Sequence, residues 1–174
     1  MAAMRKASAY SKKHVVPYTR ISKLKGKSYI KTVPPQKIVK FHMGNIKNLK
    51  YKFTLVANYR GQIRDAALEA CRQFVNKKLD TTLAGQYNFR VIPFPHHIQR
   101  ENKMLTGAGA DRMQTGMQLS FGKSIGKAAI VDKGSPVFEF EVGTPKAAQL
   151  VRHVIKQIRS KLPITVSTIY KENH

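Results

Sequence analysis

The sequence contains only one cysteine and no tryptophan among its 174 residues, and acidic residues are scarce throughout. The single cysteine, Cys71, excludes an internal disulfide, and no cluster of metal-ligating residues surrounds it in the sequence. No apolar run approaches the ~20 residues that a membrane-spanning helix requires. Residues 1–13 are basic but lack the apolar stretch of a secretory signal. These absences predict a protein of a reducing, cytoplasmic compartment with no membrane partner and no bound metal.

What is present is positive charge. The chain has 32 Lys and Arg against 9 Asp and Glu, a formal net charge of +23. No acid precedes Asp65, whereas 16 basic residues fall between Arg5 and Arg64. A free globular protein with this imbalance repels itself, so a polyanion usually neutralises it. An anionic membrane surface is disfavoured because the basic residues follow no long amphipathic helix with an aromatic face. Nucleic acid is the partner that the charge favours.

Composition divides the chain into an arm and a domain. Residues 1–36 form an extended basic arm that ends in Pro34-Pro35. This segment has too little apolar surface to offset the entropy lost on ordering, so we expect it to order only on a partner. Residues 37–174 have the length of a single domain, and we expect that domain to bind RNA.

Hydrophobic periodicity predicts two helices among six strands, in the order β-β-α-β-loop-β-β-α-β. Two helices available to cover one mixed or antiparallel sheet indicate an α+β sandwich. The strands are expected at 37–43, 51–58, 87–94, 128–131, 137–142 and 164–170, and the first helix at 62–79.

The helices are defined by apolar stripes and by their ends. Thr144 is expected to cap the second helix, with Pro145 at its first position and Pro163 beyond its end. Cys71 lies beside the first stripe and is interpreted as a small buried side chain. The first stripe is Ile63, Ala66, Ala67, Ala70 and Phe74, and the second is Ala147, Ala148, Val151, Ile155, Ile158 and Leu162.

Gly122-Lys123-Ser124 is similar to the end of a phosphate-binding loop, but its spacing is wrong. Such a loop needs a glycine five positions before Gly122, where Met117 stands, and Gly116 comes one residue too early. No buried strand leads into the segment either. A nucleotide-using enzyme is therefore excluded.

Two further groups could suggest chemistry. Adjacent histidines on an extended chain, His96 and His97, point to opposite faces, so a surface or RNA-contacting role is favoured over metal binding. Glu139 and Glu141 share a strand face, but abundant Lys and Arg are available to pair with them. We expect no enzyme activity, no cofactor and no small-molecule substrate.

The long loop at 99–127 is the candidate functional segment. Loops beyond ~15 residues are unusual inside compact domains and are usually functional or disordered. Its glycines let the backbone approach a crowded surface, and its methionines provide adaptable apolar contact. Its basic residues suit phosphate contacts, and Arg can also stack on bases: Arg100, Lys103, Arg112, Lys123 and Lys127.

Several segments in and around this loop match one family pattern. They include Pro17-Tyr18-Thr19-Arg20, Tyr29-Ile30, Ala67-Leu68-Glu69-Ala70, Arg100-Glu101-Asn102-Lys103-Met104, Gly109-Ala110-Asp111-Arg112, Gly116-Met117 and Phe121-Gly122-Lys123. Over nearly its whole length the chain resembles the large-subunit ribosomal protein sixteen family, in its archaeal and eukaryotic form. Residues 21–28 look like a basic insertion relative to that pattern.

The resemblance implies an α/β-hammerhead fold, a place on the ribosome near the path of tRNA, and no catalysis by the protein itself. The implied partners are large-subunit rRNA, the tRNA acceptor arm and neighbouring large-subunit proteins. The residues expected to bind rRNA are Arg20, Lys37, Arg100, Lys103, Lys123 and Lys127. The residues expected to face tRNA and the peptidyl-transferase centre are Met104, Gly109, Asp111, Arg112, Met113 and Gly116.

One competing hypothesis is a free nucleic-acid chaperone or chromatin-like architectural protein. Ribosomal proteins and free nucleic-acid chaperones both bind nucleic acid in a salt-sensitive way. A free chaperone should bind duplex DNA and diverse RNA almost equally, whereas a ribosomal protein should sediment with the large subunit at moderate salt.

Overall fold

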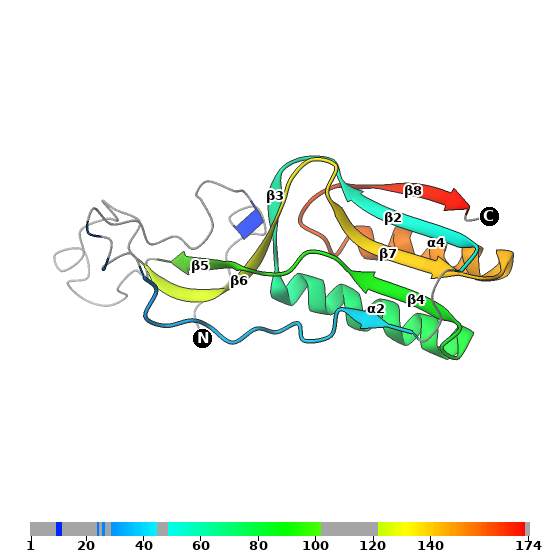
Figure 1. Ribbon diagram of the computed structural model, residues 1–174, viewed down its shortest axis with the longest axis horizontal. Helices are drawn as coiled ribbons and strands as arrows, with labels where there is room; N and C mark the ends of the chain where they lie inside the picture. Colours follow the sequence, from blue (N-terminus) through cyan, green and yellow to red (C-terminus); the bar gives the residue numbers. More distant parts are fainter. Residues whose placement is uncertain are drawn as a thin grey trace, which may run out of the picture.

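In the part of the chain that the structure describes, two long helices pack against antiparallel sheets (Figure 1). The computed structural model describes residues 10–11, 24, 26, 29–44, 49–101 and 122–172. The helices are α2 (Asp65–Leu83) and α4 (Pro145–Arg159). The five-stranded sheet has the order β1 (His42–Met43), β4 (Tyr87–Val91), β7 (Pro136–Val142), β2 (Tyr51–Ala57) and β8 (Val166–Glu172). A three-stranded sheet has the order β3 (Gly61–Arg64), β6 (Lys123–Val131) and β5 (His97–Glu101).

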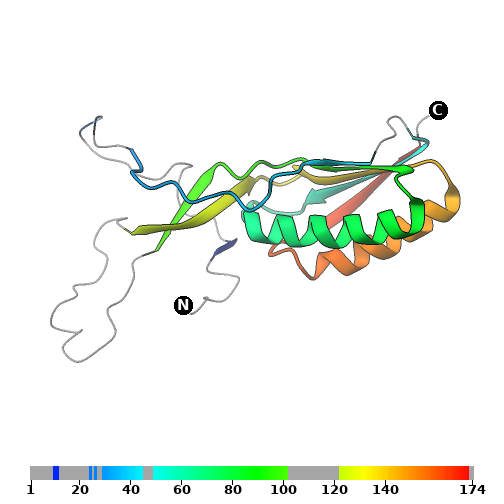
Figure 2. The same cartoon turned by 90° about the horizontal axis from the view of Figure 1, so that it is seen from below.

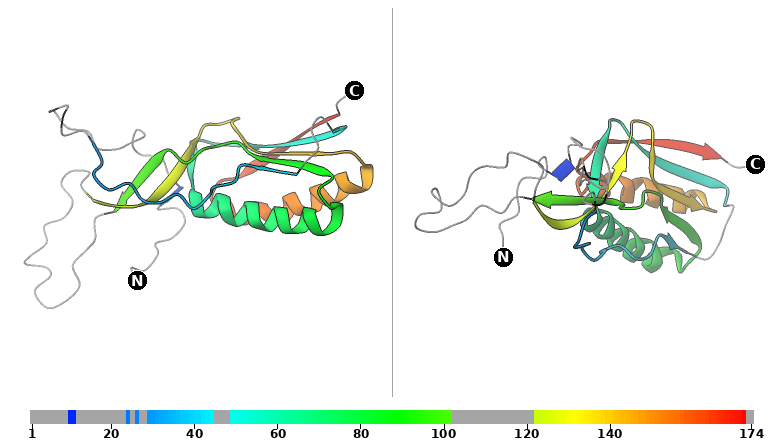
Figure 3. Two further views of the ribbon diagram at one scale, coloured as in Figure 1. Left: turned by 60° about the horizontal axis from the view of Figure 1, so that its bottom comes forward. Right: turned by 60° about the vertical axis from the view of Figure 1, so that its left-hand side comes forward.

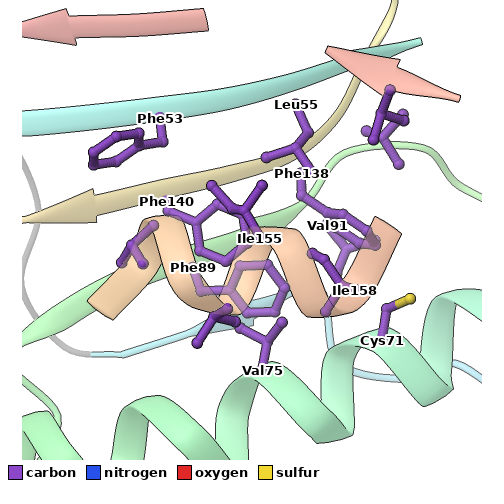
Figure 4. Packing of buried hydrophobic residues seen from close by; sticks show 14 of the residues in the cluster. Phe53, Leu55, Cys71, Val75, Phe89, Val91, Phe138, Phe140, Ile155 and Ile158 are labelled. Atoms are coloured by element: carbon purple, nitrogen blue, oxygen red, sulfur yellow. The ribbon is translucent and has the colours of Figure 1, made fainter. Parts of the chain in front are cut away.

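The core lies between the five-stranded sheet and both helices. Alternation along β2, β4 and β7 points one row of apolar side chains inward, as a half-buried strand requires. Phe89 stacks on Phe140 with ring centroids 4.7 Å apart, and Val75 and Ile155 approach them from the two helices (Figure 4). Figure 2 shows both helices on the same side of this sheet, which confirms the α+β prediction.

Helix α4 forms as its sequence predicts. The Thr144 side chain accepts a hydrogen bond from the Ala147 backbone N–H at 3.2 Å, and Pro145 occupies the first position. The predicted stripe is buried throughout, including Leu162, although the helix ends at Arg159 and Leu162 follows it.

Helix α2 corrects the predicted apolar stripe. It begins at Asp65, and it buries Leu68, Cys71, Val75 and Leu79 in place of the predicted alanines. Ala70 is exposed and Phe74 is only half-buried. The cause is Ile63, which is buried as part of strand β3 and pairs with Ala129 of β6. Because Ile63 belongs to a strand, a helical repeat counted from Ile63 does not coincide with the residues that α2 buries.

The three-stranded sheet corrects the predicted loop. Strand β5 pairs antiparallel with β6, so both ends of the predicted 99–127 loop are strands. Polar residues within these strands, and Gly126, conceal the alternation that would have indicated them. The first predicted strand, 37–43, is reduced to its last two residues, and the final strand lies two residues later than expected.

The two sheets are joined by continuous chain. Strands β2 and β3 follow one another in the chain, as do β6 and β7, and both connections turn together from one sheet into the other (Figure 1). At this turn the Ala57 N–H donates to the Ser135 carbonyl at 2.9 Å, and the Gly134 N–H donates to the Ala57 carbonyl at 2.8 Å. Gly134 has φ +82°, which favours glycine. These hydrogen bonds hold together the turns through which the chain passes from one sheet to the other. We call the three-stranded sheet the extension.

Candidate nucleic-acid interface

The three-stranded sheet brings together three of the residues predicted to bind rRNA. Arg100 lies on β5 opposite Ser124, while Lys123 and Lys127 lie on β6 opposite Glu101 and Ile98. Lys123 is exposed, and Arg100 and Lys127 are half-buried. The other predicted site residues lie outside the described residues, apart from Lys37: Arg20, Lys103, Met104, Gly109, Asp111, Arg112, Met113 and Gly116.

Lys37 lies where the arm meets the domain. Its side chain is exposed, while its backbone N–H donates to Asp65 Oδ2 at 3.1 Å. Asp65 is 1% exposed and begins α2, where a carboxylate complements the helix dipole. The arm is therefore tied to the domain at the residue where the predicted RNA-binding domain begins.

Part of the arm packs on the three-stranded sheet. The Ser124 hydroxyl donates to the Thr32 carbonyl at 2.8 Å, and Gln99 Nε2 donates to the Tyr10 carbonyl at 2.9 Å. The Arg64 guanidinium lies 4.5 Å from the centroid of the Tyr10 ring, within cation–π range. Segment 29–41 runs beside β5 and β6 toward β1 (Figure 3). The domain itself therefore supplies contacts to these arm residues, and the ordering of the arm on a partner stays a prediction.

Gly122 has a structural explanation unrelated to phosphate binding. A Cβ at this position would lie 2.7 Å from the carbonyl carbon of Glu101, closer than real side chains approach. Residues from Lys123 onward form strand β6, whereas a phosphate-binding loop opens a helix. The exclusion of a nucleotide-using site therefore agrees with the strand geometry as well as with the spacing.

The acidic residues of the five-stranded sheet are paired. Lys52 Nζ lies 3.3 Å from Glu139 and 3.5 Å from Glu141, and Arg90 lies 3.7 Å from Glu139. Asn88 donates to Glu141 at 3.0 Å. The prediction that basic residues would pair with these two glutamates is confirmed. The charges on this face largely cancel.

Burial disfavours ionisation of Cys71 and Tyr87 in the core. Burial raises the pKa of the Cys71 thiol to about 12, so the nucleophilic thiolate is absent at neutral pH. Burial also raises the pKa of the Tyr87 hydroxyl, and its hydrogen bond to Asp80 at 2.7 Å adds to the shift. The interpretation of Cys71 as a small buried side chain is confirmed.

The two adjacent histidines differ in exposure. His96 is exposed and its ring lies 4.4 Å from that of Phe94, whereas His97 is only 4% exposed. The predicted surface role is therefore wrong for His97. Within the ranges that the structure describes, no three His, Cys, Asp or Glu residues gather as a possible metal site.

Sequence reasoning missed a second basic surface, on α4. The helix contains no acid, and its exposed residues include Lys146, Arg152, Lys156 and Arg159. Two of these also serve the fold, because the Arg152 guanidinium lies 5.6 Å from the Tyr170 ring centroid and Arg159 donates to Thr168 Oγ1 at 3.1 Å. The sequence could have indicated this surface, because all the charged residues of α4 are basic.

Both the arm and the three-stranded sheet of this α+β protein carry basic residues. This arrangement is typical of the RNA-binding components of ribonucleoproteins. Residues 13–169 match the family described as ribosomal protein L16p/L10e. The chain belongs to this family of ribosomal proteins, which are structural components and not enzymes. The identification made from the loop motifs is thereby confirmed.

Similar proteins agree over most of their lengths. The chain is 41% identical to large ribosomal subunit protein uL16 of Staphylothermus marinus over 170 residues, covering 97% of this chain and 94% of that protein. It is 45% identical to the protein of the same name from Thermofilum pendens over 159 residues, covering 90% of each chain. With that from Hyperthermus butylicus it shares 46% identity over 150 residues, covering 85% of this chain and 79% of the relative. Among the helices that the structure describes, none is long and apolar enough to cross a membrane.

Proposed function

We propose that this chain is a structural constituent of the large ribosomal subunit that binds large-subunit rRNA and helps to position the tRNA acceptor arm near the peptidyl-transferase centre. The observation that carries the rRNA part is the gathering of Arg100, Lys123 and Lys127 on one projecting sheet beside a basic arm. Neighbouring large-subunit proteins are further proposed partners.

The proposed rRNA contact is mainly electrostatic. Lys123 is an exposed ammonium that can approach a phosphate freely, and Lys127 lies on the same strand. Arg100 can donate two parallel hydrogen bonds to one phosphate or lie against a base. Lys37 extends the contact toward the core, while Arg20 and Lys103 are assigned to it by the family resemblance. Neutralising several phosphates releases counterions, so binding should weaken steeply with salt.

The proposed tRNA contact belongs to the segment between β5 and β6. Strand β5 ends at Glu101 and β6 begins at Lys123, and both ends lie at the tip of the extension that is farther from the helices (Figure 1). The pairing of β5 with β6 fixes both ends of this segment next to each other. The family resemblance assigns the tRNA contact to six residues of this segment: Met104, Gly109, Asp111, Arg112, Met113 and Gly116. It leaves peptide-bond chemistry to RNA.

The hammerhead arrangement of the fold also stays a prediction from the resemblance.

Two double lysine variants, one in the candidate site and one outside it, test the proposed rRNA contact. The double variant Lys123→Gln, Lys127→Gln should bind large-subunit rRNA less tightly, and each lost phosphate contact should lower the slope of log affinity against log salt by roughly 0.7–0.9. The control Lys133→Gln, Lys171→Gln removes the same charge from exposed positions outside the candidate site. Equal effects of the two double variants would show that net charge alone governs binding and would overturn the assignment.

Arg112→Ala tests the tRNA part. The family resemblance assigns Arg112 to a tRNA contact and not to the core, and changes outside the core usually alter stability by no more than about 0.5 kcal/mol, so we expect little change in the melting temperature. Loss of a charged hydrogen bond should weaken tRNA binding to subunits that carry the variant by roughly 1.5–3 kcal/mol. Normal tRNA binding by those subunits would contradict the role assigned to Arg112.

A further inference from the structure

A cavity of about 360 Å³ lies between the arm, the connection from β4 to β5, and strand β6. Ile98 and Lys127 are direct partners in the pairing of β5 with β6, so their side chains stand on the same face of the sheet. The cavity walls include Tyr29 and Val33 from the arm, Phe94 and His96 from the connection, and Ile98 and Lys127 from the sheet.

The aromatic rings at this cavity are exposed, unlike those of the core. Tyr29 is 51% exposed and Phe94 is 44% exposed, whereas Phe89 in the core is fully buried. The Phe94 ring stacks on Phe41 with centroids 5.3 Å apart and planes 24° apart. This stack holds Phe94 in one orientation. Exposed apolar surface that is concave and already ordered is typical of a binding site.

The dimensions and chemistry of the cavity suit one flat aromatic group that carries a negative charge. Its volume is at the lower end of the ~300–1,000 Å³ that small-ligand sites span, which excludes an RNA duplex. Aromatic side chains stack on nucleobases of any sequence, and the Lys127 ammonium suits the phosphate of the same nucleotide. Bases within a duplex are covered on both faces by their neighbours, so the base must be unpaired.

We propose that this cavity binds a single unpaired nucleotide of rRNA, with its base against Tyr29 and Phe94 and its phosphate near Lys127. The inference rests on the proposed rRNA binding and adds an aromatic contact to the electrostatic ones. An apolar side chain from a neighbouring protein is the alternative occupant. Lys127 on the wall and the net charge of +23 favour RNA over it.

Variants of the aromatic wall separate stacking from charge. Tyr29→Ala should weaken binding of the full chain to large-subunit rRNA by about five- to 150-fold, the range for loss of one base–aromatic stack. The salt slope should stay unchanged, because no phosphate contact is lost. Tyr29→Phe keeps the ring and should bind normally, as should Tyr59→Ala, which removes a tyrosine of similar exposure (46%) that does not line the cavity. Phe94→Leu keeps apolar bulk without a ring and should weaken binding as Tyr29→Ala does.

Ultraviolet crosslinking of assembled large subunits identifies the occupant. Mass spectrometry should find Tyr29 or Phe94 joined to one rRNA nucleotide. The proposal is overturned if Tyr29→Ala and Phe94→Leu bind as tightly as Tyr59→Ala, or if these residues crosslink to another protein. In either case the proposed function stands as long as the Lys123→Gln, Lys127→Gln variant still loses affinity. Failure of the unsubstituted chain to bind large-subunit rRNA would overturn both proposals.

Discussion

The five-stranded and three-stranded sheets of this protein differ in how they place aromatic and charged residues. In the five-stranded sheet aromatic rings such as those of Phe89 and Phe140 are fully buried. The carboxylates of Glu139 and Glu141 form ion pairs with the Lys52 side chain. On the three-stranded sheet Lys123 is exposed and Lys127 is half-buried, and the ring of Phe94, in the connection that leads to β5, is 44% exposed. The five-stranded sheet supplies most of the core, to which the three-stranded sheet adds Ile63, Ala129 and Val131, and the proposed RNA contact lies on the three-stranded sheet. The turns from β2 to β3 and from β6 to β7 join the two sheets.

Removing a core ring should give the largest effect on stability. Phe89→Ala deletes a fully buried side chain that stacks on Phe140, so unfolding by urea should require about 3–5 kcal/mol less free energy. Ile92→Ala, which truncates a side chain that is 39% exposed, should cost less than about 1 kcal/mol. Comparable losses for the two variants would contradict the assignment of Phe89 to the core.

Gly122→Ala should disturb the extension while leaving the core folded. The added methyl group would meet the Glu101 backbone at 2.7 Å, and overpacking of this kind costs roughly 1–3 kcal/mol. Amide exchange should become faster in β5 and β6 but stay slow in α2. Gly126→Ala is the matched control, because its methyl group would meet only the flexible Arg64 guanidinium, at 3.4 Å. If Gly122→Ala accelerated exchange in α2 as well, the two sheets would form one cooperative unit.

The core should lose stability at alkaline pH through Cys71. Burial raises its pKa from 9.0 to about 12, so the unfolded chain releases the proton first and stability falls as pH rises between those values. At pH 10 this loss is on the order of 1.4 kcal/mol. Cys71→Ala should remove this part of the pH dependence, measured as the difference in unfolding free energy between pH 8 and pH 10. Tyr87 contributes in the same direction at higher pH. An unchanged difference in Cys71→Ala would show that the thiol is not protected from solvent.

The smallest expected effect is a gain in stability at the end of α2. Ala84 has φ 46°, a left-handed conformation that costs a residue with a Cβ about 1–2 kcal/mol. Ala84→Gly should therefore stabilise the fold by about 0.5–1 kcal/mol, after the greater entropy of glycine in the unfolded chain is included. Affinity for rRNA should stay the same, since Ala84 lies on the helical layer. A lower melting temperature for Ala84→Gly would contradict the left-handed assignment.

Elements with strong periodicity were predictable from the sequence. Helix α4 has a clear cap at Thr144 and a continuous stripe, and buried residues alternate along β2 from Phe53 and along β7 from Phe138, so one rule of periodicity governs each. Strands β3 and β5 are short and carry polar residues such as Gln62 and Arg100, whose strand conformation depends on pairing with β6. That pairing joins residues far apart in the sequence, and local patterns do not encode it. The phase error in α2 follows from the same cause.

The candidate site was predictable in composition but not in shape. Charge and the family motifs indicated Arg100, Lys123 and Lys127, and the structure adds that strand pairing places them on one sheet. The aromatic cavity was not predictable, because Tyr29, Phe94 and Lys127 come from three distant segments. Only the packing of the arm on the sheet brings these residues together.

Lysine footprinting tests the central claim most directly, because lysines occur on both the extension and the remaining surface. Acylation rates would be measured for each lysine in the free chain and in its complex with large-subunit rRNA. We expect rRNA to slow the modification of Lys37, Lys123 and Lys127 while Lys133 and Lys171 react as in the free chain. Protection of Lys146 and Lys156 on α4, with Lys123 and Lys127 still reactive, would contradict the account and move the RNA interface to the helical layer.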